Sequence, residues 1–377
     1  MQNRSAITTY ALLVFMIFYL FLFALPAQPA DEYIHEMTLA ADKAEVTISR
    51  HIYGHFAEHL GRGIYDGIWR KDESGGYRIR EDVVKALRAI KVPNLRWPGG
   101  CFADYYFWNN GIGPADQRPS IVNALWGGVT EDNSVGTHEF LELVELLGTE
   151  AIIVGNVGSG TVAEMARWWE YVNHPGPSPM ADLRGKNGRE APWNVRFWGV
   201  GNESWGCGGN MRPEFYADNY RRYQTFLHGY GSVRPFRIAA GAAGGDYRWT
   251  EVLMREAGQY MEGLDLHHYT ILGDWQTRKG HATEYGEAEW FELMKRGWQT
   301  EELIAGHSAV MDKYDPKKRV WLIVGEWGTW HEPEEGSQPG FLYQQQTIRD
   351  ALVASQSLNI FNLNADRVKM ANIAQTV

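Results

Sequence analysis

The sequence predicts an α/β protein that folds as a (β/α)8 barrel, the TIM barrel. Strand-like and helix-like segments alternate along nearly the whole chain, and eight strand-like segments follow one another from residue 51 onward. Alternation of strands and helices indicates a parallel sheet, and eight repeats indicate that the sheet closes on itself. The 377 residues are ample for one such domain, and the sequence shows no low-complexity linker and no second domain.

The predicted strands are short apolar runs that end in Gly, Pro or polar residues. The first begins at residue 51, and the others span 92–100, 150–158, 195–200, 237–243, 264–270, 320–330 and 368–374. The seven predicted helices span 80–91, 137–147, 161–173, 213–230, 249–258, 288–314 and 341–362. Residues 31–50 predict a short strand segment outside the barrel, and residues 173–192 predict a polar loop.

The first 30 residues have the pattern of a signal peptide. Arg4 supplies the positive charge, residues 11–25 form an unbroken apolar run, and small residues follow at 26–30. The run is shorter than the ~20 residues that a membrane span needs. The cleavage site is not a clean Ala-x-Ala, so an uncleaved N-terminal anchor is the alternative. In both cases the sequence predicts export to the periplasm or the exterior.

Composition narrows the class of ligand. The net charge of −10 argues against a nucleic-acid partner, which would require a basic surface. The 16 tryptophans favour a sugar ligand, although indole rings also fill cores. Cys101 and Cys207 each follow a Gly-rich strand end and are expected to line one pocket, either bonded or free. Their spacing fits no metal motif.

Two carboxylates occupy equivalent places in the repeat. Glu203 follows the predicted strand 195–200, and Glu326 lies in the strand 320–330, each with Gly and Trp within two residues. One carboxylate at a strand end is commonly a turn or capping group. Parallel strands, however, bring both carboxylates to the same end of the barrel. Paired carboxylates in a site lined by aromatic residues are typical of glycoside cleavage. We therefore predict Glu203 and Glu326 as the catalytic pair.

With these residues in place, the chain resembles the α-L-arabinofuranosidases of glycoside hydrolase family 51, a family of retaining barrel glycosidases. The resemblance extends from about residue 36 to the end and rests on seven motifs in order. They are Tyr53-Gly-His-Phe-Ala-Glu-His-Leu-Gly-Arg62, Arg96-Trp-Pro-Gly-Gly-Cys-Phe102, Gly201-Asn-Glu-Ser-Trp-Gly-Cys-Gly-Gly209, Asp265-Leu-His-His-Tyr269, Gly325-Glu-Trp-Gly-Thr-Trp330, Gln345-Gln-Thr-Ile-Arg-Asp-Ala351 and Met370-Ala-Asn-Ile-Ala-Gln375.

The resemblance assigns roles to the central residues. Glu203 would be the general acid and then the general base, and Glu326 the nucleophile, about 5–5.5 Å away as in other retaining pairs. Asn202 would bind the 2-hydroxyl of the sugar. Tyr269 would donate a hydrogen bond to the nucleophile, and His267 would lie close to the acid/base.

Further positions match the family's sugar-binding residues. The resemblance implies that the remaining hydroxyls are held by Glu58, Cys101 and Gln375, and that the pocket is flanked by Trp126 and Trp330. An ion pair of Glu58 with Arg62 or Arg96 is the structural alternative.

Other conspicuous residues have plainer readings. We expect Arg96 to support Glu326 or Glu58. A metal is the alternative role for His267 and His268, but neighbouring strand residues face opposite ways, so at most one points inward. Trp97, Trp198 and Trp327 are expected in the core.

The implied activity is exo-acting release of terminal α-L-arabinofuranosyl residues from arabinan, arabinoxylan or arabino-oligosaccharides, without a metal or organic cofactor. Family members often form hexamers, so a homo-oligomer is implied. Two alternatives remain: another retaining glycosidase, such as a β-xylosidase or an endo-glycanase, or an inactive sugar-binding protein.

Members of the family normally continue through a last barrel helix into a C-terminal β-sandwich. We therefore expect a barrel truncated after its eighth strand, organised as a signal peptide or anchor at 1–30, a strand segment at 31–50 and a catalytic barrel at 51–377.

Overall fold

The computed structural model describes residues 37–38, 40–73, 76–275 and 278–377. The predicted signal peptide or anchor at 1–30 lies outside these residues. The chain divides into two compact units, Met1–Glu45 and Val46–Val377, and the barrel lies in the second. Among the described residues, no helix is both long enough and apolar enough to cross a bilayer.

The strand expected at 31–50 is wrong for the part that the structure describes. Those residues hold only a short 3-10 helix, η1 (Ala41–Lys43), irregular chain and the start of a second 3-10 helix, η2 (Arg50–Tyr53). A strand needs a partner for its backbone hydrogen bonds, and this stretch pairs with none of the described strands. Its apolar residues Val46 and Ile48 are accordingly exposed.

Eight parallel strands form a closed barrel, which confirms the predicted fold class. In spatial order the barrel reads β1-β12-β11-β10-β9-β8-β7-β4, and it closes because β1 pairs with both β12 and β4. The strands are β1 (Gly54–Phe56), β4 (Asn94–Trp97), β7 (Glu150–Gly155), β8 (Phe197–Val200), β9 (Phe236–Ala243), β10 (Gly263–Thr270), β11 (Trp321–Thr329) and β12 (Val368–Ile373).

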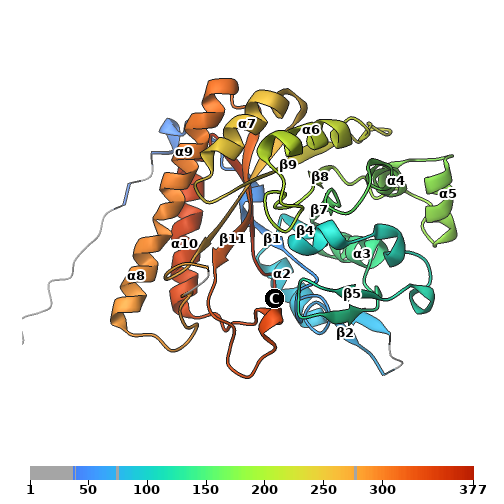
Figure 1. Ribbon diagram of the computed structural model, residues 1–377, viewed down its shortest axis with the longest axis horizontal. Helices are drawn as coiled ribbons and strands as arrows, with labels where there is room; N and C mark the ends of the chain where they lie inside the picture. The colour runs from blue at the N-terminus through green and yellow to red at the C-terminus, as the bar shows by residue number, and fades with distance from the viewer. Residues whose placement is uncertain (1–36, 39, 74–75, 276–277) are drawn as a thin grey trace, which may run out of the picture. The chain divides into compact units, whose positions relative to one another are not determined.

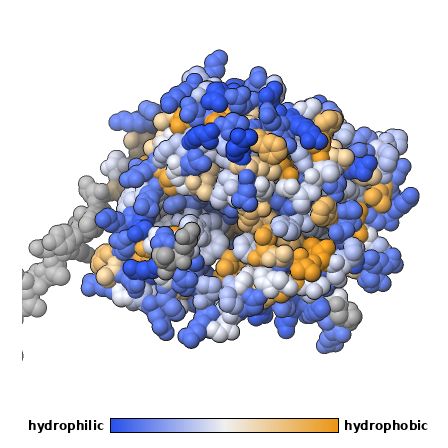
Figure 2. Space-filling model, viewed as in Figure 1, coloured by the Kyte–Doolittle hydropathy of each residue, from blue (hydrophilic) through white to orange (hydrophobic). Residues whose placement is uncertain are grey.

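Helices connect successive strands and cover the barrel. They are α2 (Glu81–Ala89), α3 (Thr137–Leu147), α4 (Val162–Asn173), α5 (Pro179–Lys186), α6 (Pro213–Gln224), α7 (Tyr247–Ala257), α8 (Glu287–Gly297), α9 (Gln299–Tyr314) and α10 (Ile348–Leu363). Figure 1 shows α8, α9 and α10 against one another on one side of the strands, with α3, α4 and α5 on the opposite side. Hydrophilic side chains cover most of the face seen in Figure 2, and apolar groups form separate patches between them.

Four helix predictions need correction. The expected loop at 173–192 contains α5, which begins with Ser178 as N-cap and Pro179 in the first turn, a start signal that the polar composition concealed. The helix expected at 288–314 is two helices that meet at Trp298. The helix expected at 213–230 ends at Gln224, and the one expected at 341–362 begins only at Ile348.

Long loops at the C-terminal ends of the first two barrel strands hold structure that the sequence did not predict. The connection after β1 contains the hairpin of β2 (Trp69–Lys71) and β3 (Tyr77–Ile79), and the connection after β4 contains that of β5 (Ile121–Asn123) and β6 (Val129–Glu131). Short 3-10 helices complete the fold: η3 (Cys101–Tyr105), η4 (Trp108–Gly111), η5 (Ala115–Gln117), η6 (Gly258–Tyr260) and η7 (Pro339–Phe341).

The core has two main parts. Ile152, Phe197, Phe236, Ile323 and Met370, together with Ile238, form a cluster contributed by five of the barrel strands. A larger cluster packs helices against the barrel strands, as expected from one apolar stripe on each helix. This larger cluster includes the buried Trp97, Trp198 and Trp327, so the prediction that these three rings belong to the core is confirmed.

Candidate active site

The turn after β8 places Glu203 at the mouth of the barrel. Gly201 has φ of +81°, a conformation that favours glycine, and Glu203 itself has φ of +39°. This left-handed backbone is held by two hydrogen bonds, in which the amides of Gly206 and Gly208 donate to the carbonyl oxygen of Glu203 at 2.7 and 3.1 Å. Strained backbone of this kind is typical of functional sites, because the surrounding structure must maintain it.

Glu326, near the end of β11, is buried, and both of its carboxylate oxygens accept hydrogen bonds. Its Oε1 accepts a hydrogen bond from Nη1 of Arg96 at 2.7 Å, and its Oε2 accepts one from the hydroxyl of Tyr269 at 2.9 Å. A buried carboxylate needs such partners, and the guanidinium supplies the opposite charge. Arg96 therefore supports Glu326 rather than Glu58.

The two glutamates face each other across His267. Ligand atoms of Glu203, His267 and Glu326 all lie within 4.8 Å of one another. Nδ1 of His267 is 2.8 Å from Oε1 of Glu203 and 3.6 Å from Oε2 of Glu326. The barrel register causes this proximity, because His267 in β10 pairs directly with Glu326 in β11. Two oxygens of Glu203 and Glu326 therefore lie no more than 4.8 Å apart, which is closer than the about 6.5–9.5 Å of an inverting pair and favours the close spacing of a retaining pair.

Asp265 anchors the other side of the imidazole. Its Oδ2 lies 3.1 Å from Nε2 of His267, and its Oδ1 accepts hydrogen bonds from the amides of Gly325 and Leu266 at 2.7 and 2.9 Å. Burial alone would lower the pKa of His267, but the carboxylates of Glu326 and Asp265 raise that pKa to about 10. His267 is therefore a cation at neutral pH that donates from both ring nitrogens. Sequence reasoning did not identify Asp265 as a site residue, although it opens one of the motifs.

Two glycines are required because side chains approach them closely. A Cβ atom on Gly100 would lie 2.5 Å from Oε1 of Glu326, and a Cβ on Gly325 would lie 2.3 Å from Oδ1 of Asp265. Any larger residue would displace these carboxylates. The Gly-Gly pair after β4 and the Gly before Glu326 thus make room for the charged groups.

Asn202 presents an unused donor. Its Oδ1 accepts a hydrogen bond from Nη2 of Arg96 at 2.6 Å, and its backbone amide donates to Oδ2 of Asp104 at 3.0 Å. The Nδ2 of Asn202 is buried without a partner among the described residues. Buried donors normally have partners, so this amide group is available to a ligand hydroxyl.

Asp104, which the sequence analysis missed, joins three loops of the mouth. Besides the amide of Asn202, its carboxylate accepts hydrogen bonds from the amides of Val157 and Gly158, both at 2.7 Å. Burial raises the pKa of Asp104 to about 6. The residue lies in an aromatic loop without any spacing signal, so only the fold reveals its role.

Glu58, just after β1, is buried among hydrogen-bond donors. Its Oε1 accepts from the amides of Gly100 and Phe102 and from Nε1 of Trp126, and its Oε2 accepts from Nε2 of Gln375 at 3.3 Å. Burial and the charge of Glu326 raise the pKa of Glu58 to about 7. The alternative of an ion pair with arginine is wrong, since Arg62 pairs with Asp66 and Arg96 pairs with Glu326.

Cys101 and Cys207 form a disulfide with a Cα–Cα distance of 5.5 Å. Their sulfur atoms lie 3.8 and 3.5 Å from Oε2 of Glu203. The disulfide therefore joins the loop after β4 to the loop that carries the predicted acid. The sequence left open whether the cysteines are bonded, and the structure shows that they are.

The two tryptophans predicted to flank the pocket lie beside different residues. Trp126 lies beside Glu58, whereas the ring of Trp330 packs edge-to-face on Tyr269 with centroids 4.8 Å apart.

His268 lies apart from His267 and its carboxylate partners. Its Nε2 is buried without a partner among the described residues, and burial lowers its pKa to about 4. The expectation that only one of the two histidines points inward therefore holds.

Two groups of potential metal ligands occur within the described residues. One consists of Glu203 with Cys101 and Cys207, whose sulfurs are already bonded to each other. The other consists of Glu203, His267 and Glu326, in which the raised pKa of His267 keeps both ring nitrogens protonated. Neither group presents a ready set of metal ligands.

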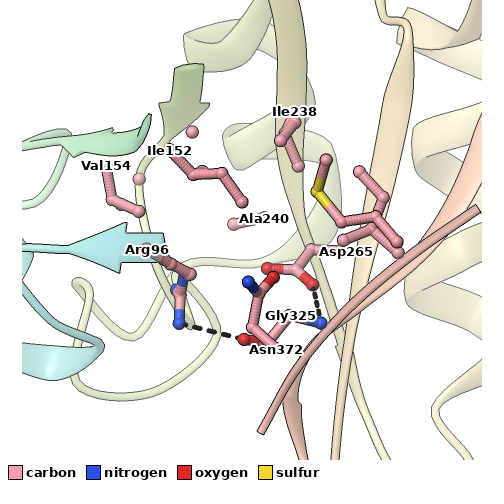
Figure 3. A pocket seen from close by; sticks show the side chains of 12 residues that line it. Arg96, Ile152, Val154, Ile238, Ala240, Asp265, Gly325 and Asn372 are labelled. Carbon is pink, nitrogen blue, oxygen red and sulfur yellow. Dashed lines mark hydrogen bonds between the residues drawn. The ribbon is translucent and has the colours of Figure 1, made fainter. Parts of the chain in front are cut away.

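A small cavity lies inside the barrel among residues that support the predicted catalytic pair (Figure 3). Arg96, Asp265 and Asn372 form its polar lining, and aliphatic side chains such as Ile152 and Ile238 complete it. Its volume of about 10 Å³ is the room that one water molecule needs. Nη1 of Arg96 donates to the carbonyl oxygen of Gly325 at 3.4 Å along its edge, so the cavity belongs to the same polar network.

Comparison with family models and known proteins gives a consistent answer. A model described as the alpha-L-arabinofuranosidase 1 domain matches residues 86–288, and one described as the alpha-L-arabinofuranosidase C-terminal domain matches residues 325–377. In this structure the second range contains most of β11, α10 and β12.

Individual relatives agree with the family models. The intracellular exo-alpha-L-arabinofuranosidase of Bacteroides ovatus is 53% identical over 346 residues, which span 90% of this chain and 67% of that protein. Alpha-L-arabinofuranosidase C of Emericella nidulans is 45% identical over 356 residues, spanning 90% of this chain and 68% of that protein.

Solved structures show the same relationship. The family 51 arabinofuranosidase of Xanthomonas axonopodis pv. citri superposes with a TM-score of 0.86 at 53% identity, over 89% of this chain and 68% of that one. The arabinose complex of the Thermotoga maritima α-L-arabinofuranosidase superposes with a TM-score of 0.76 at 34% identity, over 88% of this chain and 66% of that one.

The prediction of export is contradicted by these comparisons. The Bacteroides ovatus relative is named as intracellular, although it is 53% identical to this chain. The apolar run at 11–25 that suggested export is a compositional signal only, and it lies outside the described residues.

Proposed function

The chain belongs to the α-L-arabinofuranosidases of glycoside hydrolase family 51, and we propose that Glu203 and Glu326 carry its reaction by a retaining mechanism. The observation that supports this assignment is the placement of both carboxylates within 4.8 Å of a shared histidine at the mouth of a (β/α)8 barrel. Active sites of such barrels lie at the C-terminal ends of the strands, where both residues are found.

In the first step the carboxylate of Glu326 attacks the anomeric carbon of a terminal arabinofuranosyl residue. The carboxyl proton of Glu203 passes to the glycosidic oxygen, the bond to the leaving group breaks, and an ester joins the sugar to Glu326. In the second step the carboxylate of Glu203 takes a proton from water. The oxygen of that water displaces Glu326 from the anomeric carbon, which releases arabinose and restores both groups.

The surrounding residues keep the pair in these roles. Oε1 of Glu203 is occupied by His267, so Oε2 is the oxygen left to reach the glycosidic bond. Arg96 and Tyr269 hold the attacking carboxylate of Glu326 by two hydrogen bonds. The free Nδ2 of Asn202 would donate to the 2-hydroxyl of the sugar, an interaction that strengthens in the transition state.

The terminal sugar would also be held by polar groups around Glu58. Glu58 and Gln375 would bind its remaining hydroxyls, since Oε1 of Gln375 is buried without a partner among the described residues. The walls would be formed by Trp126, Trp330 and the disulfide of Cys101. Arabinan, arabinoxylan and arabino-oligosaccharides are the proposed sources of the substrate.

The homo-oligomer implied by the family remains a prediction, which sedimentation velocity of the full chain would test.

Azide rescue distinguishes the roles of the two glutamates. Glu326→Ala should lose activity on an aryl α-L-arabinofuranoside and, with azide, form the β-azide, because azide replaces the nucleophile. Glu203→Ala should accumulate the glycosyl-enzyme and, with azide, form the α-azide. The same product anomer from both variants, or activity of Glu326→Ala near that of the parent, would refute the assignment. Trp298→Ala, on the outer helices, is the control.

A further inference from the structure

Three aromatic rings form a continuous cluster beside the nucleophile. Trp330 packs on Tyr269 and on Trp275, with centroids 4.8 Å apart in both pairs, and Trp275 lies 5.8 Å from Tyr269. All three pairs are close to perpendicular, with interplanar angles of 85°, 83° and 88°. Edge-to-face packing of this kind fixes the rings relative to one another.

The cluster runs from the reacting carboxylate to solvent. At its inner end the hydroxyl of Tyr269 donates to Oε2 of Glu326 at 2.9 Å. Trp330 is partly buried, and at the outer end Trp275 is 48% exposed. A substrate whose anomeric carbon lies at Glu326 therefore has an apolar wall that continues outward past the terminal sugar.

Hydrogen bonds of the described residues around Trp275 hold its backbone. Asp274 and Arg278 exchange backbone hydrogen bonds at 3.1 and 3.3 Å, and Nζ of Lys279 donates to the carbonyl oxygen of Trp275 at 3.1 Å. The amide of Lys279 also donates to Oε1 of Glu332 at 2.9 Å, which ties the turn to the segment after β11. The backbone that carries the indole is therefore held by hydrogen bonds.

A single exposed aromatic residue is ordinary and needs no function. Trp298, 55% exposed between α8 and α9, is an example, since none of the ring contacts of the described residues involves it. Trp275 differs because its ring continues the wall of the active site. The position combines exposure, a fixed orientation and direct contact with a residue that touches the nucleophile.

From this arrangement we propose that Trp275 is a binding platform for the leaving-group sugar, the residue on the far side of the bond that is cleaved. The inference rests on the proposed function. The terminal arabinofuranosyl group occupies the inner site among Glu58, Asn202 and Gln375, so the next sugar must lie outward. The C–H groups of a sugar ring pack on an indole and bury apolar surface. Trp275 thereby favours glycosides whose leaving group is itself a sugar.

Paired substrates test this proposal. For α-1,5-arabinobiose, Trp275→Leu should lower kcat/KM by about tenfold, the size of one favourable aromatic contact. For methyl α-L-arabinofuranoside, whose leaving group has no ring, kcat/KM should stay within about twofold. Trp275→Phe, which keeps an aromatic ring, should recover most of the arabinobiose activity, whereas Trp275→Gln, which removes the ring, should lose it as the leucine variant does; inhibition by free arabinose should not change. Trp298→Ala should leave both substrates unaffected.

Other outcomes overturn the proposal. An equal loss on both substrates would mean that Trp275 only supports Tyr269 or Trp330, and no loss on either would mean that it binds nothing. Thermal unfolding of each variant checks the fold, and Trp275→Gln keeps the test valid if the leucine variant does not fold. Failure of the unaltered protein to cleave either substrate would instead refute the proposed function.

Discussion

Nε2 of His267 lies 3.1 Å from Oδ2 of Asp265, while Nδ1 of the same ring lies 2.8 Å from Oε1 of Glu203. The imidazole therefore links a buried carboxylate of the barrel interior to the predicted acid/base. Because both nitrogens face carboxylates, the ring is charged and its orientation is determined by Asp265.

The first prediction concerns Asp265→Asn. Removing this charge should lower the pKa of His267 from about 10 toward its ordinary value, because Asp265 is one of the three carboxylates, with Glu326 and Glu203, that raise it. The alkaline limb of the kcat/KM profile should then move to lower pH. Measurement of kcat/KM from pH 5 to 10 checks the shift. A uniform loss at every pH, without displacement of the limb, would show that Asp265 is merely structural.

Two adjacent histidines should give opposite pH dependence of stability. The pKa of His267 is raised to about 10. Its contribution to the free energy of unfolding is therefore complete below about pH 6.5 and is lost as the pH rises through 10. The pKa of His268 is lowered to about 4, so its contribution is lost as the pH falls from about 6.5 toward 4.

Urea unfolding measured from about pH 4 to about pH 10 tests both effects on stability. His268→Asn should flatten the acid side, and His267→Asn the alkaline side. Unchanged slopes in both variants would contradict these assignments.

The disulfide should stabilise the mouth of the barrel. It closes a loop between residues 106 positions apart, and such crosslinks typically contribute about 2–4 kcal/mol. Reduction should lower the free energy of unfolding by that amount, measured by urea titration with and without reductant. The double variant Cys101→Ala/Cys207→Ala should be insensitive to reductant. Equal stability of the oxidised and reduced protein would contradict the prediction.

Most of the barrel could be predicted because strand and helix periodicity are local properties of the chain. The positions of Glu203 and Glu326 at strand ends were evident for the same reason. Asp104 and Asp265 were missed, since their importance arises from contacts across 98 residues to Asn202 and 60 residues to Gly325. The hairpins β2–β3 and β5–β6 were missed because strands of three residues carry almost no periodicity.

The turn that carries Trp275 shows the same limit. Nothing in its local sequence distinguishes Trp275 from Trp298, and both are exposed. Only the packing of Trp275 against Trp330 and Tyr269 sets the former apart as a candidate for the site. Burial, by contrast, was foreseeable for Trp97, Trp198 and Trp327, which lie within apolar strands or at their ends.

Asn202→Ala should affect the transition state more than ground-state binding. Loss of the Nδ2 donor should lower kcat by about 10²–10³-fold, as for other donors to developing charge. With a 2-deoxy substrate, which lacks the hydroxyl, the same substitution should have little further effect. Comparing kcat of the parent and of the variant, each with the normal and the 2-deoxy substrate, measures the coupling between Asn202 and the 2-hydroxyl as in a double-mutant cycle. Additive losses would show that Asn202 does not contact the 2-hydroxyl.

Gly100→Ala should remove activity without removing the fold. The added methyl group would lie 2.5 Å from Oε1 of Glu326, so this proposed nucleophile would have to move away from Arg96 and from the anomeric carbon. A displacement of this kind typically costs about 100-fold in rate. Gly286→Ala is the matched control, because a Cβ at Gly286 meets nothing within 4 Å. Steady-state kinetics of both variants, beside their circular dichroism spectra, make the comparison. Full activity of Gly100→Ala would mean that Glu326 does not need the position that the structure gives it.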